Sequence, residues 1–467
     1  MSRFNNPKVL PALLFRPGLP ATGVAAELPR SLQNERIRAV ALPERAFEIG
    51  SEPVPNMLQV CCFFVVNAYL LSGCANDLIF HFTRGKMYIS AACVILLPLL
   101  FLGTGACLRG LQTPTGMWFA AFAAWLLIAS PFSFWKGGSA NMLVNYIPRA
   151  FLVCFYLAAC AVTVRQVRTV VRVMGIGALF VTLSCYVFGG WVDGRFAIPD
   201  SLFYSNANEL GLQLLLGIVI LMYPFFEKNK FAKFVSAAGI LVSLIYILKT
   251  GSRGVLIAML ATAFALVLMS HRRMTVLLVA VPALVLAFVL APPEMRHRIT
   301  LIGSTQNAQD ADSSAVASRM QREKLLKTSI VLAITNPVFG VGPGQFIAKA
   351  SGEQEKKGEH ADWRGTHNSY TQVASEAGLP ALIFYVAAIV TCMRMNYRLY
   401  RRSTGRQGLE TIAGISFCMF FATFVYSIGT FFDHEAYSLQ LPLMAGVSIS
   451  LYLAAKPVLE RYEKETV

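Results

Sequence analysis

Charged residues are scarce in this sequence. They make up only 14% of its 467 residues, whereas hydrophobic residues make up 55%, and the mean hydropathy is +0.55. A soluble protein carries about 25% charged residues, so the composition argues against a water-soluble enzyme. Apolar runs recur along the chain at the ~20-residue length that a membrane helix needs. The sequence therefore predicts an all-α polytopic membrane protein.

Metal-binding and disulfide-forming patterns are also missing. The ten cysteines form no CxxC pair and have no zinc-site spacing, which argues against a disulfide framework and a zinc site. His360 and His367 lie near Glu359 and Asp362, but this spacing matches neither HExxH nor a zinc finger. We therefore expect no metal and no cofactor.

Acidic residues are outnumbered, because 25 Asp and Glu against 41 Lys and Arg give a net charge of +16. Such a balance can indicate nucleic-acid binding. Here the basic residues gather at the ends of apolar runs, as the positive-inside rule describes, so we expect membrane lipids and no nucleic acid as partner. No signal-peptide core precedes the first run, and residues 1–55 are expected to be a cytoplasmic tail.

The apolar runs predict about twelve membrane spans. Their approximate ranges are 57–75, 87–105, 117–135, 146–164, 170–189, 208–226, 234–250, 254–270, 274–291, 379–395, 411–431 and 437–455. Basic residues in alternate short loops place both chain ends in the cytoplasm. The expected parts are a tail, nine spans, a large and partly helical outer loop between helices 9 and 10, three further spans and a second tail, with the bounds 1–55, 56–291, 292–378, 379–455 and 456–467.

Two arginines are expected on the outer face, where basic residues are normally depleted. Arg253 opens the eighth span with glycines close on either side, and Arg195 precedes a polar run that contains Asn208. Two guanidinium groups from different loops can clamp a diphosphate in bidentate fashion. The alternatives are a snorkelling side chain for Arg253 and an ordinary surface pair between Asp193 and Arg195.

The large outer loop contains two structural signals. The first is an amphipathic helix from Ser314 to Ile334, with a basic first half that includes Arg319 and with four apolar residues, Val316, Met320, Ile330 and Ile334. The second is the turn Gly340 to Gly344, which resembles a phosphate-binding loop but lacks the Lys-Ser/Thr that would follow. We expect this turn to position the outer segment.

The segment Gly365 to Gly378 joins a titratable side chain to a helix start at the edge of a span. An outer-face His367 with a pKa near 6.5 can act as a general base. A polar helix cap is the alternative. His434, between two acidic residues, is a weaker candidate for a second role on this face. The residues expected to support the base are Asn368, Tyr370 and Glu376.

Three short motifs occur in a fixed order around the large outer loop. They are Ser252-Arg253-Gly254 at the opening of a span, the turn Gly340 to Gly344 with Phe346, and His367-Asn368-Ser369-Tyr370 with Glu376 and Gly378 before the next span. Together with the number of spans, this order resembles the O-antigen ligase and O-antigen (exopolysaccharide) polymerase superfamily of Wzy_C-like membrane glycosyltransferases.

The resemblance implies a metal-independent glycosyltransferase of the GT-C type that acts on the periplasmic face of the bacterial inner membrane. In such enzymes two outward arginines hold the diphosphate of an undecaprenyl-diphosphate glycan donor, and a loop histidine activates the acceptor hydroxyl. Arg253 and His367 match these residues by motif, and Arg195 matches the second arginine by location only. Asn208 and Arg319 are expected to support or bind the substrate.

Two acceptors stay open. A ligase transfers lipopolysaccharide O antigen to lipid A-core, whereas a polymerase transfers the glycan to another lipid-linked repeat unit. The expected partners are thus the lipid-linked donor, one of these acceptors, and membrane lipids. A polytopic transporter or flippase is the alternative from another class. It would have inverted repeats, broken midplane helices and charges deep in the spans, and none of these is clear in the sequence.

Overall fold

The structure is a computed structural model of the chain. It describes residues 53–83, 88–192, 194–199, 201, 203–269, 313–356, 358 and 363–466, together with residues 274, 278, 282, 285 and 289. All of these residues belong to one unit, Phe47–Val467. The predicted N-terminal tail, apart from residues 53–55, lies outside the described part of the chain.

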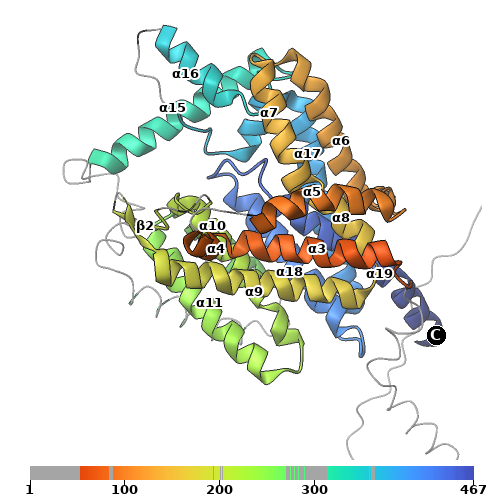
Figure 1. The fold of residues 1–467 in the computed structure, drawn as a ribbon. Coiled ribbons are helices and arrows are strands. Elements are labelled where there is room, and N and C mark those ends of the chain that lie inside the picture. The colour runs from red at the N-terminus through yellow and green to blue at the C-terminus, as the bar shows by residue number, and fades with distance from the viewer. Residues whose placement is uncertain are drawn as a thin grey trace, which may run out of the picture. The chain divides into compact units, whose positions relative to one another are not determined.

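Helices dominate the described part of the chain (Figure 1). The α-helices are α3 Met57–Cys74, α4 Asn76–Thr83, α5 Tyr88–Gly103, α6 Pro114–Ala129, α7 Lys136–Tyr146, α8 Val153–Cys160, α9 Val164–Phe188, α10 Ala207–Leu221, α11 Lys230–Thr250, α12 Arg253–Met269, α15 Ser313–Thr335, α16 Phe346–Lys356, α17 Ser369–Ser403, α18 Glu410–Gly429 and α19 Gln440–Thr466. Short 3₁₀ and π turns are Arg109–Gln112, Ser130–Phe132, Ile147–Phe151 and Tyr223–Phe226. Strands β1 Gly190–Val192 and β2 Arg195–Ala197 form an antiparallel hairpin in which Val192 pairs with Arg195.

Within the described residues, nine helices are long and apolar enough to cross a membrane. Two shorter apolar helices, Ile89–Gly103 and Arg253–Met269, accompany them. The predicted class of an all-α polytopic membrane protein is therefore confirmed. Each expected span overlaps one of these helices except 274–291, which lies almost entirely outside the described residues. The number twelve stays a prediction.

Helix α17 makes many of the contacts that position the site. It packs against α18, α6, α15 and α19 (Figure 1). Tyr385 of α17 and Tyr426 of α18 are buried, and their hydroxyl groups lie 2.9 Å apart. A second group of helices forms around α10, which packs against α9, α11 and α18. Helix α18 thus links the two groups.

Helix α17 is kinked at Gly378, whose φ of 82° lies in the left-handed region. A Cβ there would lie 2.0 Å from the carbonyl oxygen of Val338, so the position requires glycine. Pro380 follows, and its nitrogen has no hydrogen to donate to the carbonyl of Glu376. The kink falls where the outer loop is predicted to end, while α17 itself already begins at Ser369.

The glycine-rich turn uses the backbone groups that this kink leaves free. The N–H groups of Val341 and Gly342 donate to the carbonyl oxygens of Ser375 and Glu376, each at 2.8 Å. The indole N–H of Trp125 in α6 donates to the carbonyl oxygen of Ala377 at 2.9 Å. Three successive carbonyls of α17 therefore have partners outside the helix. The turn is fastened to α17, as its expected positioning role requires.

Helix α15 coincides with the amphipathic helix predicted from Ser314 to Ile334, but the predicted apolar face is wrong. Leu325 and Leu332 are buried and pack in one cluster with Phe346 of α16. They lie seven residues apart, so two turns of helix bring them to the same face. The side chain of Val316 lies outside the description, and the other predicted apolar residues are 66%, 43% and 71% exposed, in the order Met320, Ile330 and Ile334.

Candidate active site

His367 lies directly before α17, and its backbone is held in an uncommon conformation. Its φ is 52°, and it is the one non-glycine residue with a positive φ among those described. Asn368 caps the helix, because its side-chain oxygen accepts from the N–H groups of Tyr370 and Thr371. The hydroxyl of Thr366 donates to the carbonyl of Asn368 at 2.9 Å. Backbone conformations of this kind persist where surrounding contacts fix them, often at functional sites.

The loop between α18 and α19 is fastened to this first turn of α17. The backbone N–H of Ser369 donates to the carbonyl of Thr430 at 2.8 Å. The Ser369 hydroxyl donates to the carbonyl of Asp433 at 2.9 Å and accepts from the N–H of Glu435 at 2.7 Å. The amide of Asn368 donates to the carbonyl of Phe431 at 3.2 Å. The two segments therefore form one structural unit, although 66 positions separate Ser369 from Glu435.

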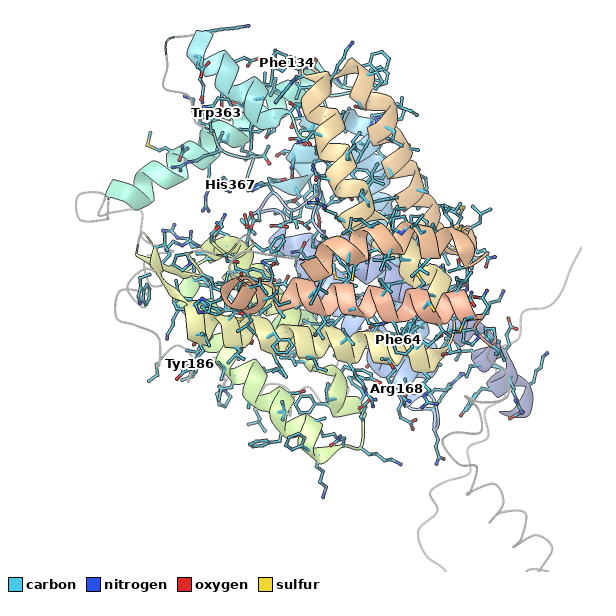
Figure 2. The ribbon with its side chains drawn as sticks, in the orientation of Figure 1. Phe64, Phe134, Arg168, Tyr186, Trp363 and His367 are labelled. Atoms are coloured by element: carbon cyan, nitrogen blue, oxygen red, sulfur yellow. The ribbon has the colours of Figure 1, made fainter. Side chains whose placement is uncertain are left out.

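This arrangement places two histidines side by side. The rings of His367 and His434 meet edge to face, with centroids 5.4 Å apart and planes at 90°. Gly365 makes room for them, since a Cβ at this position would lie 2.8 Å from the His434 ring. Figure 2 shows His367 between α15 and the bundle of membrane helices. The prediction that His367 lies at a helix start is confirmed. The sequence did not predict that His434 lies beside it.

His434 carries a charge that its neighbours stabilise. Its Nδ1 lies 3.4 Å from the Oδ1 of Asp433, which is almost fully buried. Burial alone would lower the pKa of His434, but the hydrogen bond and charge of the adjacent Asp433 raise it above its ordinary value. The carboxylate of Asp433 therefore favours the imidazolium form of His434.

His367 is in the opposite state. Burial lowers the pKa of His367 to about 4, and the charges of His434, Arg322 and Arg364 act in the same direction against the opposing charge of Asp433. Its Nδ1 is enclosed and has no hydrogen-bond partner among the described groups. The expected pKa near 6.5 is wrong because burial and the proximity of His434 and Arg322 were not visible in the sequence. His367 is neutral at physiological pH, and its free ring nitrogen can accept a proton.

Two arginines face this region from different helices. Arg253 is exposed at the first residue of α12, and no described residue forms a hydrogen bond with its side chain. Arg322 comes from α15; burial lowers its pKa, and it interacts electrostatically with both Asp433 and Arg253. Sequence reasoning chose Arg319 instead, whose side chain lies outside the description. Arg322 lies three positions before the buried Leu325, so the two side chains share one face of α15. This spacing was the signal in the sequence that could have indicated Arg322.

Arg195 and Asn208 form a clasp next to Arg253. The side-chain oxygen of Asn208 accepts from Nη2 of Arg195 at 2.7 Å and from the hydroxyl of Ser252 at 2.8 Å. Nε of Arg195 donates to the carbonyl of Thr250 at 3.0 Å. The two predicted arginines therefore lie on neighbouring segments. Arg195 already uses two of its nitrogens to hold the turn that carries Arg253. Asp193, its other suggested partner, lies outside the described residues.

Glu376 and Tyr370 support the site from a distance. Glu376 is 3% exposed, and its carboxylate accepts from the N–H groups of Gly344 at 3.0 Å and Phe346 at 3.1 Å. It thus caps α16 and fastens the glycine-rich turn, as carboxylates do at helix N-termini. The hydroxyl of Tyr370 donates to the carbonyl of Ser427 at 2.7 Å, which ties α17 to α18.

Carboxylates also gather around Asp433. Donor atoms of Glu209, Asp433 and Glu435 lie within 4.8 Å of one another, and so do those of His367, Asp433 and His434. Both triplets are close enough for one cation to bridge them. However, burial and the charge of Asp433 raise the pKa of Glu435, which favours its neutral form. The charge of Asp433 is offset by His434, so the cluster is compensated internally. Of the residues that were weighed as a metal site with His367, Glu359, His360 and Asp362 lie outside the described residues.

Comparison with known families identifies one domain. Residues 238–386 match the family model for O-antigen ligase, Wzy_C. This range includes Arg253, Arg322, His367 and Glu376, whereas Arg195, Asn208 and the loop containing His434 lie outside it. No curated protein matches the chain. Residues 238–386 are therefore similar to the O-antigen ligase family.

Proposed function

We propose that this protein is an inner-membrane glycosyltransferase that moves a glycan from undecaprenyl diphosphate to an acceptor hydroxyl on the periplasmic face. We assign the reaction to lipopolysaccharide O-antigen ligation, with lipid A-core as the acceptor. The observation that carries the proposal is the neutral, strained His367 within electrostatic reach of Arg322, which interacts in turn with the exposed Arg253. A proton acceptor and an anion site are the two parts that such a transfer needs.

The reaction balances with these groups alone. The acceptor hydroxyl attacks the anomeric carbon, and its proton moves to a ring nitrogen of His367. The bond between that carbon and the phosphate oxygen breaks, and the diphosphate leaves with the electron pair. Guanidinium groups that are already in place stabilise the charge that develops on the leaving oxygens. The reaction is therefore proposed to be independent of metal ions and cofactors.

Each selected residue has a role in this proposal. Arg253 contacts the diphosphate, with Arg322 on the opposite side. Arg195 contributes to diphosphate binding and, through Asn208, holds the turn before α12. Arg319 is placed on the same helix as Arg322 and is proposed to bind substrate. Asn368, Tyr370 and Glu376 hold α17, the loop after α18 and the glycine-rich turn in position.

The proposed topology follows the distribution of basic residues. Both termini are placed in the cytoplasm, and the segment 292–378 and the loop around His434 are placed in the periplasm. The parts 1–55, 56–291, 292–378, 379–455 and 456–467 are the proposed tail, first spans, loop domain, last spans and second tail. A membrane-impermeant maleimide tests this placement. A cysteine at exposed Trp363 should be labelled from the periplasm, and one at exposed Arg401 should not.

The function is tested with purified protein in nanodiscs, an undecaprenyl-diphosphate-linked glycan and lipid A-core. Arg253→Ala and His367→Ala should each abolish transfer while the protein stays folded. The matched control is Arg165→Ala, because Arg165 is an exposed arginine near the start of another span. Full transfer by Arg253→Ala or His367→Ala would contradict the proposal. A product on lipid-linked glycan rather than on lipid A-core would identify a polymerase.

A further inference from the structure

We propose that binding of the donor diphosphate activates His367, which burial and three neighbouring cations otherwise keep a poor proton acceptor. This inference deepens the proposed function and rests on it. The three cations are Arg322, Arg364 and His434, called here the cationic group. His434 is its central member, because its ring lies against that of His367 and its charge depends on the neighbouring Asp433.

The cationic group approaches His367 from three elements. His434 lies edge to face with the His367 ring in the loop after α18. Arg322 comes from α15 and is half-buried. Arg364 lies three residues before His367, and its Nη1 donates to Oε1 of Gln321, which holds it against α15. The cations thus lie on the α15 side and on the α18 side of one imidazole.

The anion that opposes these cations is Asp433, and it already interacts with His434. Asp433 is 2% exposed; its Oδ1 accepts from the backbone N–H of His434 at 2.9 Å and lies 3.4 Å from the His434 ring. His434 also faces Glu435 and Glu209 and influences Glu376. The groups that act on His367 itself are His434, Arg322, Arg364 and Asp433. Within the part of the chain that the structure describes, cations therefore outnumber anions around His367.

This charge balance has a chemical consequence. Burial and neighbouring cations both disfavour the protonated imidazole, in agreement with the pKa of about 4 for His367. A diphosphate between Arg253 and Arg322 brings two or more negative charges to the same place. It offsets Arg322 and favours the imidazolium, so His367 becomes a stronger base. A general base works best when its pKa approaches the working pH. His367 would then accept a proton efficiently only while the donor is bound.

The first test measures the proton affinity of His367 without any transfer. Full-length protein in nanodiscs is treated with diethyl pyrocarbonate, which modifies neutral imidazole, between pH 3.5 and 8, and the His367 peptide is quantified by mass spectrometry. We expect a titration midpoint near pH 4 in the free protein. With undecaprenyl diphosphate as the probe, the midpoint should rise by about one pH unit or more. An unchanged midpoint would overturn the inference.

Two variants separate charge from structure. His434→Gln removes the cation, so the midpoint of the free protein should already be higher by about one pH unit. His434→Lys keeps a cation opposite Asp433 and should keep the midpoint close to that of the wild type. A purely structural role of His434 would give both variants the same midpoint, and that result would contradict the proposal. Retained tryptophan fluorescence and a retained gel-filtration profile establish that each variant is folded.

Kinetics provide an independent measurement. The pH dependence of kcat/KM reports the free enzyme, and that of kcat reports the donor complex. The acidic limb of kcat should therefore lie at a higher pH than that of kcat/KM, and the two limbs should approach each other in His434→Gln. Two results distinguish the proposals. If His367→Ala still transfers glycan, while the modification midpoint of His367 in the wild-type protein rises on donor binding, the proposed function fails and the charge effect stands. If His367→Ala is inactive and no midpoint moves, only the further inference fails.

Discussion

The hydroxyl of Ser369 donates to the backbone carbonyl of Asp433 at 2.9 Å. The same hydroxyl accepts from the N–H of Glu435, so one buried side chain makes two of the hydrogen bonds that hold the loop after α18 on the first turn of α17. His434 lies in that loop and His367 lies two residues before Ser369. The distance between the two imidazoles therefore depends on this serine.

Ser369→Ala should impair transfer without preventing insertion. The substitution removes both hydrogen bonds of a fully buried hydroxyl, which costs about 1–3 kcal/mol because buried partners stay unsatisfied. We expect the His434 loop to shift and transfer to fall about tenfold. The control is Ser427→Ala, whose hydroxyl makes only a local bond to Phe424. Thermal unfolding and transfer assays on both variants decide the prediction, and equal behaviour of the two would contradict it.

Glu376 should be more important for the glycine-rich turn than for the chemistry. Glu376→Ala leaves the N–H groups of Gly344 and Phe346 without their acceptor, so we expect a loss of about 1–3 kcal/mol in the free energy of unfolding. Glu376→Gln keeps one carbonyl oxygen and should lose less. Limited proteolysis of the segment between α15 and α17 measures the effect. Equal cleavage of wild type and Glu376→Ala would be evidence against this anchoring role.

Arg253 should require the guanidinium group and not merely a positive charge. A guanidinium can contact two phosphate oxygens in one plane, whereas an ammonium is a point charge. Arg253→Lys should therefore raise KM for the donor and reduce kcat/KM by about tenfold or more, while Arg253→Ala abolishes transfer. Steady-state kinetics with varied donor test this order. Equal activity of Arg253→Lys and wild type would show that no bidentate contact is made.

Removal of divalent ions should leave transfer intact. Asp433 lies beside the His434 ring, and burial raises the pKa of Glu435 and favours its neutral form, so the proposed reaction does not need an ion there. The assay is repeated after treatment with EDTA and again after addition of Mg²⁺ or Mn²⁺. Activity that EDTA removes and one of these ions restores would instead assign a cation to the carboxylates around Asp433.

Much of the fold could be predicted because membrane helices can be recognised from the local sequence alone. Runs of about twenty apolar residues give their own length and position, and the helix start at Asn368 is visible as a polar cap. The amphipathic helix in the outer segment was also predictable, but its buried face was not. Apolar residues such as Ile334 are exposed there, while the side that carries Arg322 and Leu325 packs inward.

The electrostatics of the site could not be predicted from the sequence. Nothing local in the residues around His367 indicates that His434 is its neighbour, since the contact arises from the packing of α17 on α18. The pKa of His367 depends on burial and on cations from three separate segments. Arg195 was predicted as a phosphate contact from its expected location, and its hydrogen bonds to Asn208 and Thr250 became visible only in the folded chain.

The most direct test of the central claim separates donor binding from transfer in His367→Gln. Glutamine keeps a polar side chain at this position but cannot accept the acceptor's proton as imidazole does. With undecaprenyl-diphosphate-linked glycan in nanodiscs, we predict donor binding close to that of the wild type and a loss of transfer of about 100-fold or more. Transfer at the wild-type rate, or a loss explained entirely by weaker donor binding, would contradict the assignment of His367 as the base.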